Sequence, residues 1–385
     1  MKILFVTHYV ELYGANRSLL NLLKGLSRYK VNFQVLSPRD GPIADKVKEL
    51  GGSVIFSDIG HWAMAEDRYN EYSLNGKLYL LRKQLRFLSG TEFLLRPEIR
   101  CFSPDVVYTN SSVCTTGYVI SKKLQVPHVW HIREFVYEDY RMRFILGKFI
   151  ASKVIKKSSA VIAISESLRR SFFGKRYSPQ VHVVYNGVIS HSDIARYNSA
   201  SVSQTGVLRL LILGFIHAKK GQETAIQAIQ KVNLNGKRVI LDIVGDGDCA
   251  ELDRLRQLTK DLKVDDSVKF LGYSEDPFSL YANYDGLIMA SKMEAMGRVT
   301  AEAMIMGLPV IGRNSGATVE LIKNGQTGYL FSAGAEGFAD AIERVLENRL
   351  FWRQMGENAK KYALSRFTEE IYSEKISKIL NKLFE

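Results

Sequence analysis

The stretch that decides the fold is Gly286-Leu287-Ile288-Met289-Ala290, followed at once by Ser291-Lys292-Met293-Glu294-Ala295-Met296-Gly297-Arg298-Val299-Thr300-Ala301-Glu302-Ala303-Met304. The first five residues predict a buried strand, and the residues from Arg298 onward predict a helix. Another strand is predicted at Pro309–Ile311, immediately after Gly307-Leu308. A strand, a short loop, a helix and a second strand in this order are typical of parallel sheets covered by helices.

The same alternation of short strands and helical segments runs along the whole chain. Before residue 190, strands are predicted at Ile3–His8, Phe33–Ser37, Ser53–Phe56, Val106–Thr109, His128–His131, Ala160–Ile164 and His182–Tyr185. After residue 206, strands are predicted at Leu208–Phe215, Val239–Val244 and Val268–Leu271, in addition to the two strands above. Ser190–Gly206 is rich in Ser, Asn and Ala, a composition that is typical of a linker.

We therefore predict an α/β protein with two Rossmann-like, doubly wound domains that face a central cleft. The first domain is expected over residues 1–190 and the second over residues 207–365. A C-terminal helix over residues 366–385 is expected to pack back on the first domain. The total of 385 residues suits two hydrophobic cores better than one.

The composition excludes several classes of protein. The chain is 46% hydrophobic and 24% charged, as ordinary soluble proteins are. Its longest apolar runs, such as Val161–Ile164 and Leu210–Leu213, are far shorter than the ~20 residues that cross a bilayer. No export signal is recognised after Met1, so a cytoplasmic location is expected. The three cysteines are scattered and odd in number, which argues against a disulfide framework and against a zinc site.

Positive charge is concentrated in the first half of the chain. Residues 1–190 contain 28 basic residues (Lys and Arg) against 15 acidic residues (Asp and Glu). Residues 191–385 contain 25 basic and 25 acidic residues. Such an excess attracts an anionic partner: a nucleic acid, a membrane surface or a phosphorylated substrate. Two segments, Leu78–Arg100 and Arg141–Lys157, combine apolar and basic residues. The second has the spacing of a basic amphipathic helix, which fits either an anionic membrane or the protein core.

A glycine-rich turn follows one predicted strand and precedes a helix, with the sequence Val244-Gly245-Asp246-Gly247-Asp248-Cys249-Ala250. It matches the loosest form of the dinucleotide-binding pattern, G-x-G-x-x-A. A nicotinamide cofactor would place its diphosphate beside Asp246 and Asp248, and the pattern normally follows the first strand of a domain. The sequence therefore favours a tight turn, and an oxidoreductase is the less favoured alternative.

The residues after Ala290 have the features of an anion-binding site. Glu294 falls on the loop at the carboxyl end of a strand, where open α/β sheets bind their ligands. Gly297 permits close backbone approach, and the helix that follows directs free amides and its positive dipole end to an anion. Glu302 lies about one turn inside this helix. It either faces the crevice at the carboxyl end of the strand, as Glu294 does, or is a solvated surface residue. Lys220, at the mouth of another strand–helix turn, is placed to neutralise a diphosphate.

At these residues the chain resembles the large family of retaining glycosyltransferases with the GT-B fold, known as family 4 or glycosyl transferases group 1. Glu294 and Glu302 match its E-x7-E pattern, and the residues from Glu294 to Gly297 stand where the family has E-G-F-G. Three further motifs match in the family's order: Lys220-Gly221, Gly307-Leu308-Pro309-Val310-Ile311 and Thr327-Gly328-Tyr329-Leu330-Phe331. The resemblance covers nearly the whole chain.

The resemblance implies a role for each residue of this site. Glu302 should bind the ribose hydroxyls of a sugar nucleotide, and Glu294 the hydroxyls of the transferred sugar. Lys220 should neutralise the leaving phosphate, so that Glu294 and Lys220 are predicted to be catalytic. The diphosphate should be held by the loop and helix terminus at Met296, Gly297, Arg298 and Val299.

The resemblance also extends to the first domain. Gly14, Ala15 and Asn16 resemble the family's glycine-rich phosphate loop, although Ala15 replaces the second of two glycines. His131 matches a histidine that is often found beside the donor sugar, and it is predicted to be catalytic as well. A second departure is Phe215, which stands where the family usually has an arginine, so the phosphate contacts differ in detail.

These resemblances imply a retaining, metal-independent hexosyltransferase that uses a UDP or GDP sugar and needs no cofactor. No metal is expected, because the D-x-D pattern Asp246-Gly247-Asp248 lies in a turn and not at a strand end. The implied acceptor is lipid-linked or an oligosaccharide, in cell-surface polysaccharide synthesis. The enzyme is then expected at the inner face of the cell membrane, with an anionic membrane surface and no nucleic acid as partner. A non-catalytic two-domain sugar-binding protein and a nicotinamide oxidoreductase are the alternatives.

Overall fold

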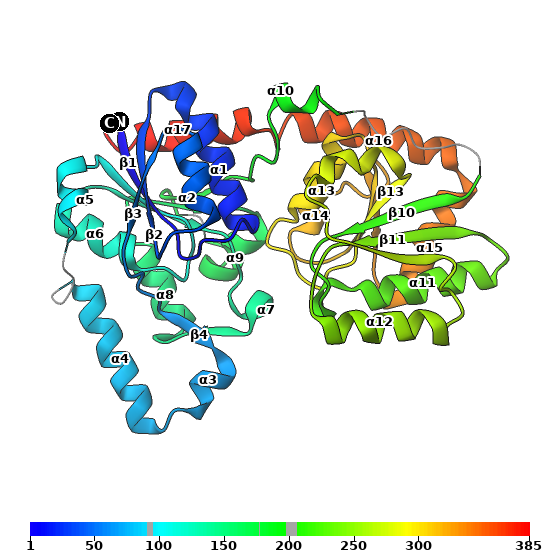
Figure 1. Cartoon of the computed structure of the whole chain (residues 1–385), viewed down its shortest axis with the longest axis horizontal. Coiled ribbons are helices and arrows are strands. Elements are labelled where there is room, and N and C mark those ends of the chain that lie inside the picture. The colour runs from blue at the N-terminus through cyan, green and yellow to red at the C-terminus, as the bar shows by residue number, and fades with distance from the viewer. Residues whose placement is uncertain (91–94, 177, 198–205) are drawn as a thin grey trace. The chain divides into compact units, whose positions relative to one another are not determined.

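The computed structural model describes residues 1–90, 95–176, 178–197 and 206–385. These residues form two compact units (Figure 1): unit one comprises Met1–Gly187 and Glu369–Glu385, and unit two comprises Val188–Thr368. Each unit is built on one parallel sheet with helices beside it. Within the described residues, no helix combines the length and the apolar character needed to cross a membrane.

Unit one is built on a seven-stranded parallel sheet with the strand order β3-β2-β1-β5-β6-β8-β9. Its strands are β1 (Lys2–Val6), β2 (Asn32–Ser37), β3 (Ser53–Phe56), β5 (Val106–Thr109), β6 (His128–Ile132), β8 (Ala160–Ala163) and β9 (Val181–Val183). Its helices are α1 (Gly14–Leu26), α2 (Pro42–Glu49), α3 (Glu66–Glu71), α4 (Leu74–Ser89), α5 (Pro97–Phe102), α6 (Thr116–Leu124), α7 (Tyr137–Tyr140), α8 (Gly147–Ile155), α9 (Glu166–Phe173) and α17 (Glu369–Asn381). Two short strands, β4 (Ala63–Ala65) and β7 (Met142–Phe144), pair antiparallel outside this sheet.

Unit two is built on a six-stranded parallel sheet with the strand order β12-β11-β10-β13-β14-β15. Its strands are β10 (Leu208–Leu213), β11 (Val239–Val244), β12 (Val268–Gly272), β13 (Gly286–Met289), β14 (Val310–Arg313) and β15 (Gly328–Phe331). Its helices are α10 (His191–Ile194), α11 (Gln222–Leu234), α12 (Cys249–Asp261), α13 (Arg298–Ile305), α14 (Thr318–Leu321), α15 (Gly334–Glu347) and α16 (Arg349–Leu364).

The strands predicted from the sequence are all present, and their ends differ by at most two residues from the prediction. The reason is burial on both faces of each sheet, which turns a strand into a continuous apolar run. In β1, for example, every residue of Ile3–Val6 is completely buried. Strand β15 was not predicted as a strand, because its Gly-Tyr-Leu-Phe sequence is too short and too mixed to stand out.

The helix predicted over Arg141–Lys157 is wrong in its first part. Met142–Phe144 forms strand β7, and helix α8 begins only at Gly147. Arg141 and Gly147 both have positive φ angles, of 53° and 76°, which interrupt any continuous helix. Phe144 is buried against Trp62, with ring centroids 5.5 Å apart, so this part of the apolar pattern serves a strand.

Helix α17 belongs to the core of unit one, although it follows unit two in the chain. Tyr372, Ile376 and Leu380 are buried in the same apolar cluster as Leu22 and Leu26 of α1. These side chains recur at intervals of four, so they form one face of α17. Unit one therefore takes its last helix from a segment that is distant in sequence.

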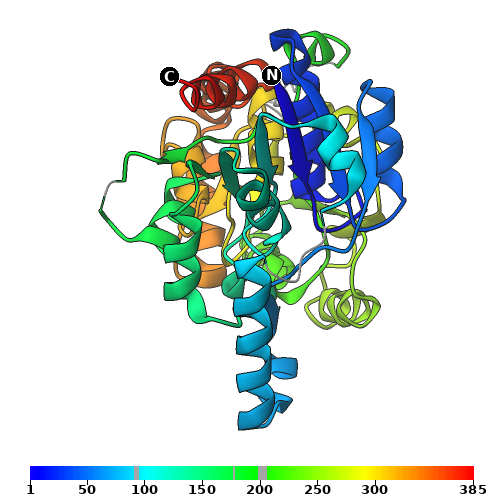
Figure 2. The ribbon, with the colours of Figure 1, turned by 90° about the vertical axis from the view of Figure 1, so that its left-hand side faces the viewer.

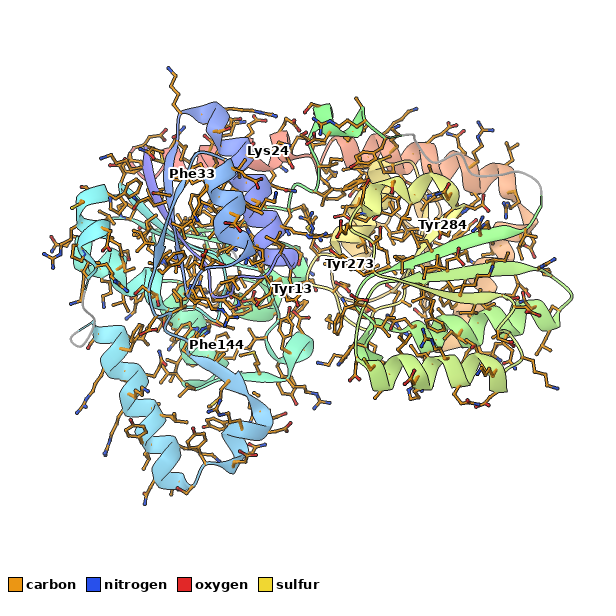
Figure 3. The ribbon with its side chains drawn as sticks, in the orientation of Figure 1. Tyr13, Lys24, Phe33, Phe144, Tyr273 and Tyr284 are labelled. Atoms are coloured by element: carbon orange, nitrogen blue, oxygen red, sulfur yellow. The ribbon has the colours of Figure 1, made fainter. Side chains whose placement is uncertain are left out.

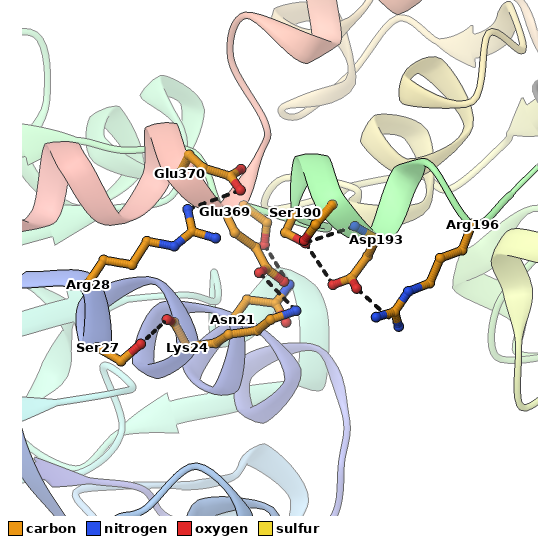
Figure 4. A network of polar contacts seen from close by, with 11 residues as sticks. Asn21, Lys24, Ser27, Arg28, Ser190, Asp193, Arg196, Glu369 and Glu370 are labelled. Atoms are coloured by element: carbon orange, nitrogen blue, oxygen red, sulfur yellow. Dashed lines mark hydrogen bonds and ion pairs between the residues drawn. The ribbon is translucent and has the colours of Figure 1, made fainter.

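The contact between α1 and α17 is close. A Cβ atom built on Gly25 of α1 would lie 2.5 Å from the Cβ of Ser373, so only glycine fits at this position. Two ion pairs lie beside this contact (Figure 4): Lys24 Nζ of α1 with Glu369 Oε2 at 3.6 Å, and Arg28 Nη1, just after α1, with Glu370 Oε1 at 3.1 Å. Backbone proximity at Gly25 and charge at the edges thus fix the position of α17.

Candidate functional site

Glu294 lies on the loop between β13 and α13 of unit two, and its side chain is 14% exposed. A neighbouring loop holds this segment, because the Ala317 amide donates a hydrogen bond to the Glu294 carbonyl oxygen at 2.9 Å. A Cβ atom on Gly316 would lie only 2.8 Å from the same oxygen. The structure therefore fixes the backbone that carries this carboxylate.

Lys220 comes from the turn after β10, and its ammonium donates to Oε1 of Glu294 at 2.7 Å. Gly221 follows with a φ angle of 76°, and a Cβ there would lie 2.2 Å from the Ala290 carbonyl oxygen. Only glycine allows the two loops to come so close. Because β10 and β13 are parallel neighbours, Lys220 and Glu294 meet at the carboxyl end of the sheet of unit two.

Glu302 is 4% exposed, so its interpretation as a solvated surface residue is wrong. Arg298 Nη2 donates to one carboxylate oxygen at 3.2 Å, and the Tyr281 hydroxyl donates to the other at 3.1 Å. Burial first, and then the charge of Glu302, raise the pKa of Tyr281 well above its ordinary value. Tyr281 therefore stays protonated and acts as a donor, while Arg298 balances the charge of Glu302.

Helix α13 begins beside these two carboxylates. Gly297 is its N-cap residue, with left-handed angles of φ 80° and ψ 69°, and its carbonyl oxygen accepts from the Thr300 amide at 3.1 Å. The first-turn amides of a helix have no partner within the helix, and they carry the positive end of its dipole. Met296, just before, is 2% exposed, and its side chain packs inward. This terminus is thus suited to bind an anion near Lys220 and Glu294.

The predicted phosphate loop of unit one lies at the start of α1. Gly14 is the first residue of α1, and Tyr13 before it is 67% exposed (Figure 3). Asn16 is completely buried, and its side-chain amide donates to two carbonyl oxygens of the β1–α1 loop, both at 2.9 Å. Its side chain therefore fixes the loop, and an anion contact at Gly14, Ala15 and Asn16 stays a prediction.

His131 lies inside β6 and its ring has no exposed surface. Its Nδ1 atom is 2.6 Å from the Tyr108 hydroxyl and 3.2 Å from Nη2 of Arg133. Burial first, and then the charge of Arg133, hold the pKa of His131 well below its ordinary value, so the ring is neutral. His131 thus belongs to a buried network of unit one, and its contact with a donor sugar stays a prediction.

Arg133 and Glu134 were missed by the sequence reasoning, although two charged residues directly after an apolar strand are a usable signal. Arg133 is 6% exposed and donates to three side chains of unit one: Asn110 at 2.6 Å, Asn186 at 2.7 Å and Tyr372 at 3.0 Å. Glu134 accepts from the Ser111 hydroxyl at 2.8 Å and from the Ser112 amide at 2.7 Å. Burial raises the pKa of Glu134, in spite of these donors. Both residues therefore serve to order the end of β6.

The glycine-rich turn after β11 serves the packing of two loops. A Cβ atom on Gly245 would lie 2.0 Å from the Gly214 carbonyl oxygen, and one on Gly247 would lie 2.2 Å from that of Ile216. Asp248 caps α12 by accepting a hydrogen bond from the Ala250 amide at 2.9 Å. These contacts account for the glycines and for the second aspartate without a dinucleotide.

Two family models match the chain, one for each unit. "Glycosyltransferase Family 4" matches residues 13–190 and "Glycosyl transferases group 1" matches residues 194–362. Together the two models match most of the chain, with a boundary close to the division between unit one and unit two.

Two curated relatives are similar to part of the chain. N-acetyl-alpha-D-glucosaminyl L-malate synthase of Bacillus anthracis is 31% identical over 223 residues, which cover 56% of this chain and 58% of that protein. The lipopolysaccharide core biosynthesis glycosyltransferase LpsE of Rhizobium meliloti is 28% identical over 172 residues, which cover 44% of this chain and 49% of that protein. The chain therefore spans about half the length of these two relatives.

A solved structure is similar over the whole chain. Anabaena Alr3699/HepE in complex with UDP has a TM-score of 0.74 and 22% identity, and the match covers 99% of this chain and 100% of that one. Such a likeness shows the fold, and the two family models agree with it. The chain belongs to the family 4 glycosyltransferases and has their α/β GT-B fold.

Proposed function

We propose that this protein transfers a hexose from a UDP sugar, with retention at the anomeric carbon, to a lipid-linked or glycan acceptor. The observation that carries the proposal is the arrangement at the carboxyl end of the unit-two sheet. There the Lys220–Glu294 pair, at 2.7 Å, lies beside the amino terminus of α13, and Glu302 is buried one turn further on. This site offers a cation, the first amides of a helix and two carboxylates to one ligand.

Each group has a matching part in a nucleotide sugar. The diphosphate would bind the amides at Gly297–Val299, where the helix dipole favours negative charge. The ribose hydroxyls would donate to Glu302, whose position is already fixed by Arg298 and Tyr281. The hydroxyls of the transferred sugar would bind Glu294.

The same geometry supports the chemical step. Negative charge develops on the leaving diphosphate as the glycosidic bond breaks, and donors aimed at this charge lower the barrier. Lys220 would supply a positive charge there once a phosphate oxygen replaces Glu294 as its acceptor. Transfer without a metal ion is part of the proposal, because a lysine and a helix terminus can perform the neutralisation. The departing phosphate would itself accept the proton of the attacking hydroxyl, on the face from which it leaves.

The donor, the acceptor and the location are proposed from similarity and charge. UDP is favoured because the similar Anabaena structure contains UDP. A surface-polysaccharide or lipid-linked acceptor is favoured because the similar LpsE acts in lipopolysaccharide core biosynthesis. In unit one, the amides at Gly14 and Ala15 are proposed as a second phosphate contact, and His131 as a catalytic group beside the donor sugar. We also propose a cytoplasmic location at the membrane surface.

Thermal unfolding with UDP, GDP, dTDP and NAD tests the donor site. A ligand at 100 times its dissociation constant should stabilise the protein by about 2.7 kcal/mol. UDP should do so for the wild type but not for Glu302→Ala. The matched control is Glu336→Ala, which removes a glutamate of the same unit whose side chain is 72% exposed.

The outcomes separate the candidate functions. Stabilisation by UDP that is lost in Glu302→Ala and kept in Glu336→Ala supports the proposal. Stabilisation by NAD alone would favour the oxidoreductase, and no response to any nucleotide would remove the assigned donor site. The anomeric configuration of the product, followed by proton NMR from a UDP sugar, then tests retention.

A further inference from the structure

Helix α4 of unit one (Leu74–Ser89) is a well-formed helix that packs against very little. Ser73 caps it by accepting a hydrogen bond from the Gly76 amide at 3.2 Å, and Gly90 ends it with a φ angle of 76°. Of its sixteen residues, only Gln84 and Leu88 are buried. Figures 1 and 2 both show α4 extending away from the sheet of its own unit. Most of its side chains are therefore at least partly exposed to solvent.

An apolar stripe runs along α4. Leu74, Leu78, Leu81 and Leu85 follow one another at intervals of four, three and four, which places them on one face of the helix. Leu74, Leu78 and Leu85 are 76%, 43% and 52% exposed. Single exposed leucines are ordinary, but a row of them on one helix face marks an interaction surface.

The rest of α4 is strongly basic. It contains four cations and no acidic residue: Lys77, Arg82, Lys83 and Arg86. At helical spacing, Lys77 lies beside the stripe on one side, and Arg82 and Arg86 lie on the other. Tyr79, which is 62% exposed, adds a ring with a polar end. Basic side chains thus flank the leucine stripe on both sides, and Lys77 among them also lies 5.1 Å from the centre of the Tyr69 ring of the same unit.

We propose that α4 lies in the plane of an anionic lipid bilayer, with its leucine stripe among the acyl chains and its basic residues at the headgroup phosphates. Helices that bind membranes in this way combine a basic polar face with an apolar face of modest hydrophobicity. Lys and Arg side chains also extend from the edge of such a face to the phosphates. The proposal concerns binding only, so it does not depend on the proposed sugar transfer.

The charge of α4 decides between a bilayer and a second copy of the chain. A leucine stripe could pair with the same stripe of another molecule, as in a coiled coil. Such a pair would bring together eight cations with no acidic side chain of α4 to balance them, which is destabilising. Anionic phosphates supply the balancing charge, so the lipid surface fits the observed pattern better.

By its sequence, the segment Arg141–Lys157 is one that fits an anionic membrane, but the structure favours α4 for this role. Helix α8, within the basic segment Arg141–Lys157, buries one face through Ala151, Ser152 and Ile155. One face of its exposed Phe149 ring is covered by the Lys153 ammonium, which lies 4.3 Å from the centre of the ring. Helix α4 presents a longer and less covered apolar face, so the proposal is placed there.

Sedimentation of the full chain with lipid vesicles tests the proposal. The stripe variant is Leu74→Ser, Leu78→Ser and Leu85→Ser together, which changes only exposed side chains. The matched control is Leu234→Ser with Leu350→Ser, two leucines of unit two that are 76% and 66% exposed. The wild type and the control should bind phosphatidylglycerol vesicles about tenfold better than phosphatidylcholine vesicles, and the stripe variant should lose most of this binding.

A tryptophan probe gives an independent reading. The native Trp62, Trp130 and Trp352 are completely buried, so their emission should not respond to vesicles. In a Leu78→Trp variant, the added tryptophan should shift to shorter wavelengths when phosphatidylglycerol vesicles are added.

Three results would overturn the proposal. The first is a stripe variant that sediments as well as the wild type, and the second is an unchanged emission of Leu78→Trp. The third is a wild-type dimer that the stripe variant converts to a monomer without any vesicle binding, because the stripe would then be an interface between copies. UDP stabilisation, measured on the same preparations, shows separately whether the donor site works.

Discussion

Replacing Lys220 by Met should weaken UDP binding and leave the free protein almost as stable as before. The pair with Glu294 joins a side chain that is 40% exposed to one that is 14% exposed. Solvent screens such a pair, so its loss should cost only about 0.2–1 kcal/mol of stability. In the complex, a diphosphate oxygen would replace Glu294 and accept a charge-assisted hydrogen bond from Lys220, which is worth about 1.5–3 kcal/mol. The difference, about 1–2 kcal/mol, corresponds to a Kd for UDP that is about 5–30-fold higher.

The partner substitution should act in the opposite direction. Glu294→Gln removes the carboxylate that competes for Lys220 and that repels the diphosphate. UDP should therefore bind about 2–5-fold more tightly, whereas turnover of a UDP sugar should fall because the contact with the sugar hydroxyls is weakened.

Isothermal titration with UDP at low salt measures both effects, and thermal unfolding without ligand measures the stability of each free variant. If both variants weaken UDP binding equally, Lys220 and Glu294 do not compete in the way described. If Lys220→Met leaves the Kd unchanged, the amides of α13 hold the diphosphate without help, and the role given to Lys220 is refuted.

Three further predictions follow from buried contacts. Tyr281→Phe removes a hydrogen bond to the buried Glu302, so urea denaturation should show a loss of about 1.5–3 kcal/mol, and an unchanged midpoint would mean that the bond contributes nothing. Gly25→Ala should destabilise the protein by about 1–3 kcal/mol through overpacking against Ser373. Adding Ser373→Gly should restore part of this loss in thermal unfolding, whereas a further loss would contradict the steric reason. Burial holds the pKa of His128 at about 3, below its ordinary value of 6.5. The unfolded chain therefore binds a proton at this residue below pH 6.5 and the folded protein does not, so stability should fall as pH decreases from 6.5 toward 3. His128→Asn should flatten the curve of unfolding free energy against pH in this window, and an equally steep curve would assign the effect to other groups.

Much of the fold could be predicted because burial leaves a direct trace in the sequence. Ile3–Val6 and Val161–Ile164 are apolar because parallel strands are covered on both faces. The segment from Glu294 to Glu302 could likewise be placed at a strand end, since its loop and helix follow a strand of this kind. Local patterns were sufficient wherever the structure depends on neighbours in sequence.

The remaining features depend on partners that are distant in the chain. Tyr281 contacts Glu302 across 21 positions, and no local pattern marks it as a ligand of that carboxylate. The ring of His131 lies 6.3 Å from that of Tyr372 on α17, and no local pattern around β6 marks this neighbour. Met142–Phe144 has apolar residues that fit a helix and a strand equally well, and the pairing with β4 decides between them.

The return of α17 to unit one has a consequence for biosynthesis. The ribosome completes the whole of unit two before it makes Tyr372, Ile376 and Leu380, which fill the core of unit one. During that time the apolar face of α1 is uncovered, and Arg133 lacks the hydroxyl of Tyr372 as an acceptor. Unit two is one continuous segment and can fold first. Unit one remains an incomplete folding intermediate until α17 has been made. Unit one, which is made first, should therefore be the part of the nascent chain that is most exposed to proteases and most often bound by chaperones.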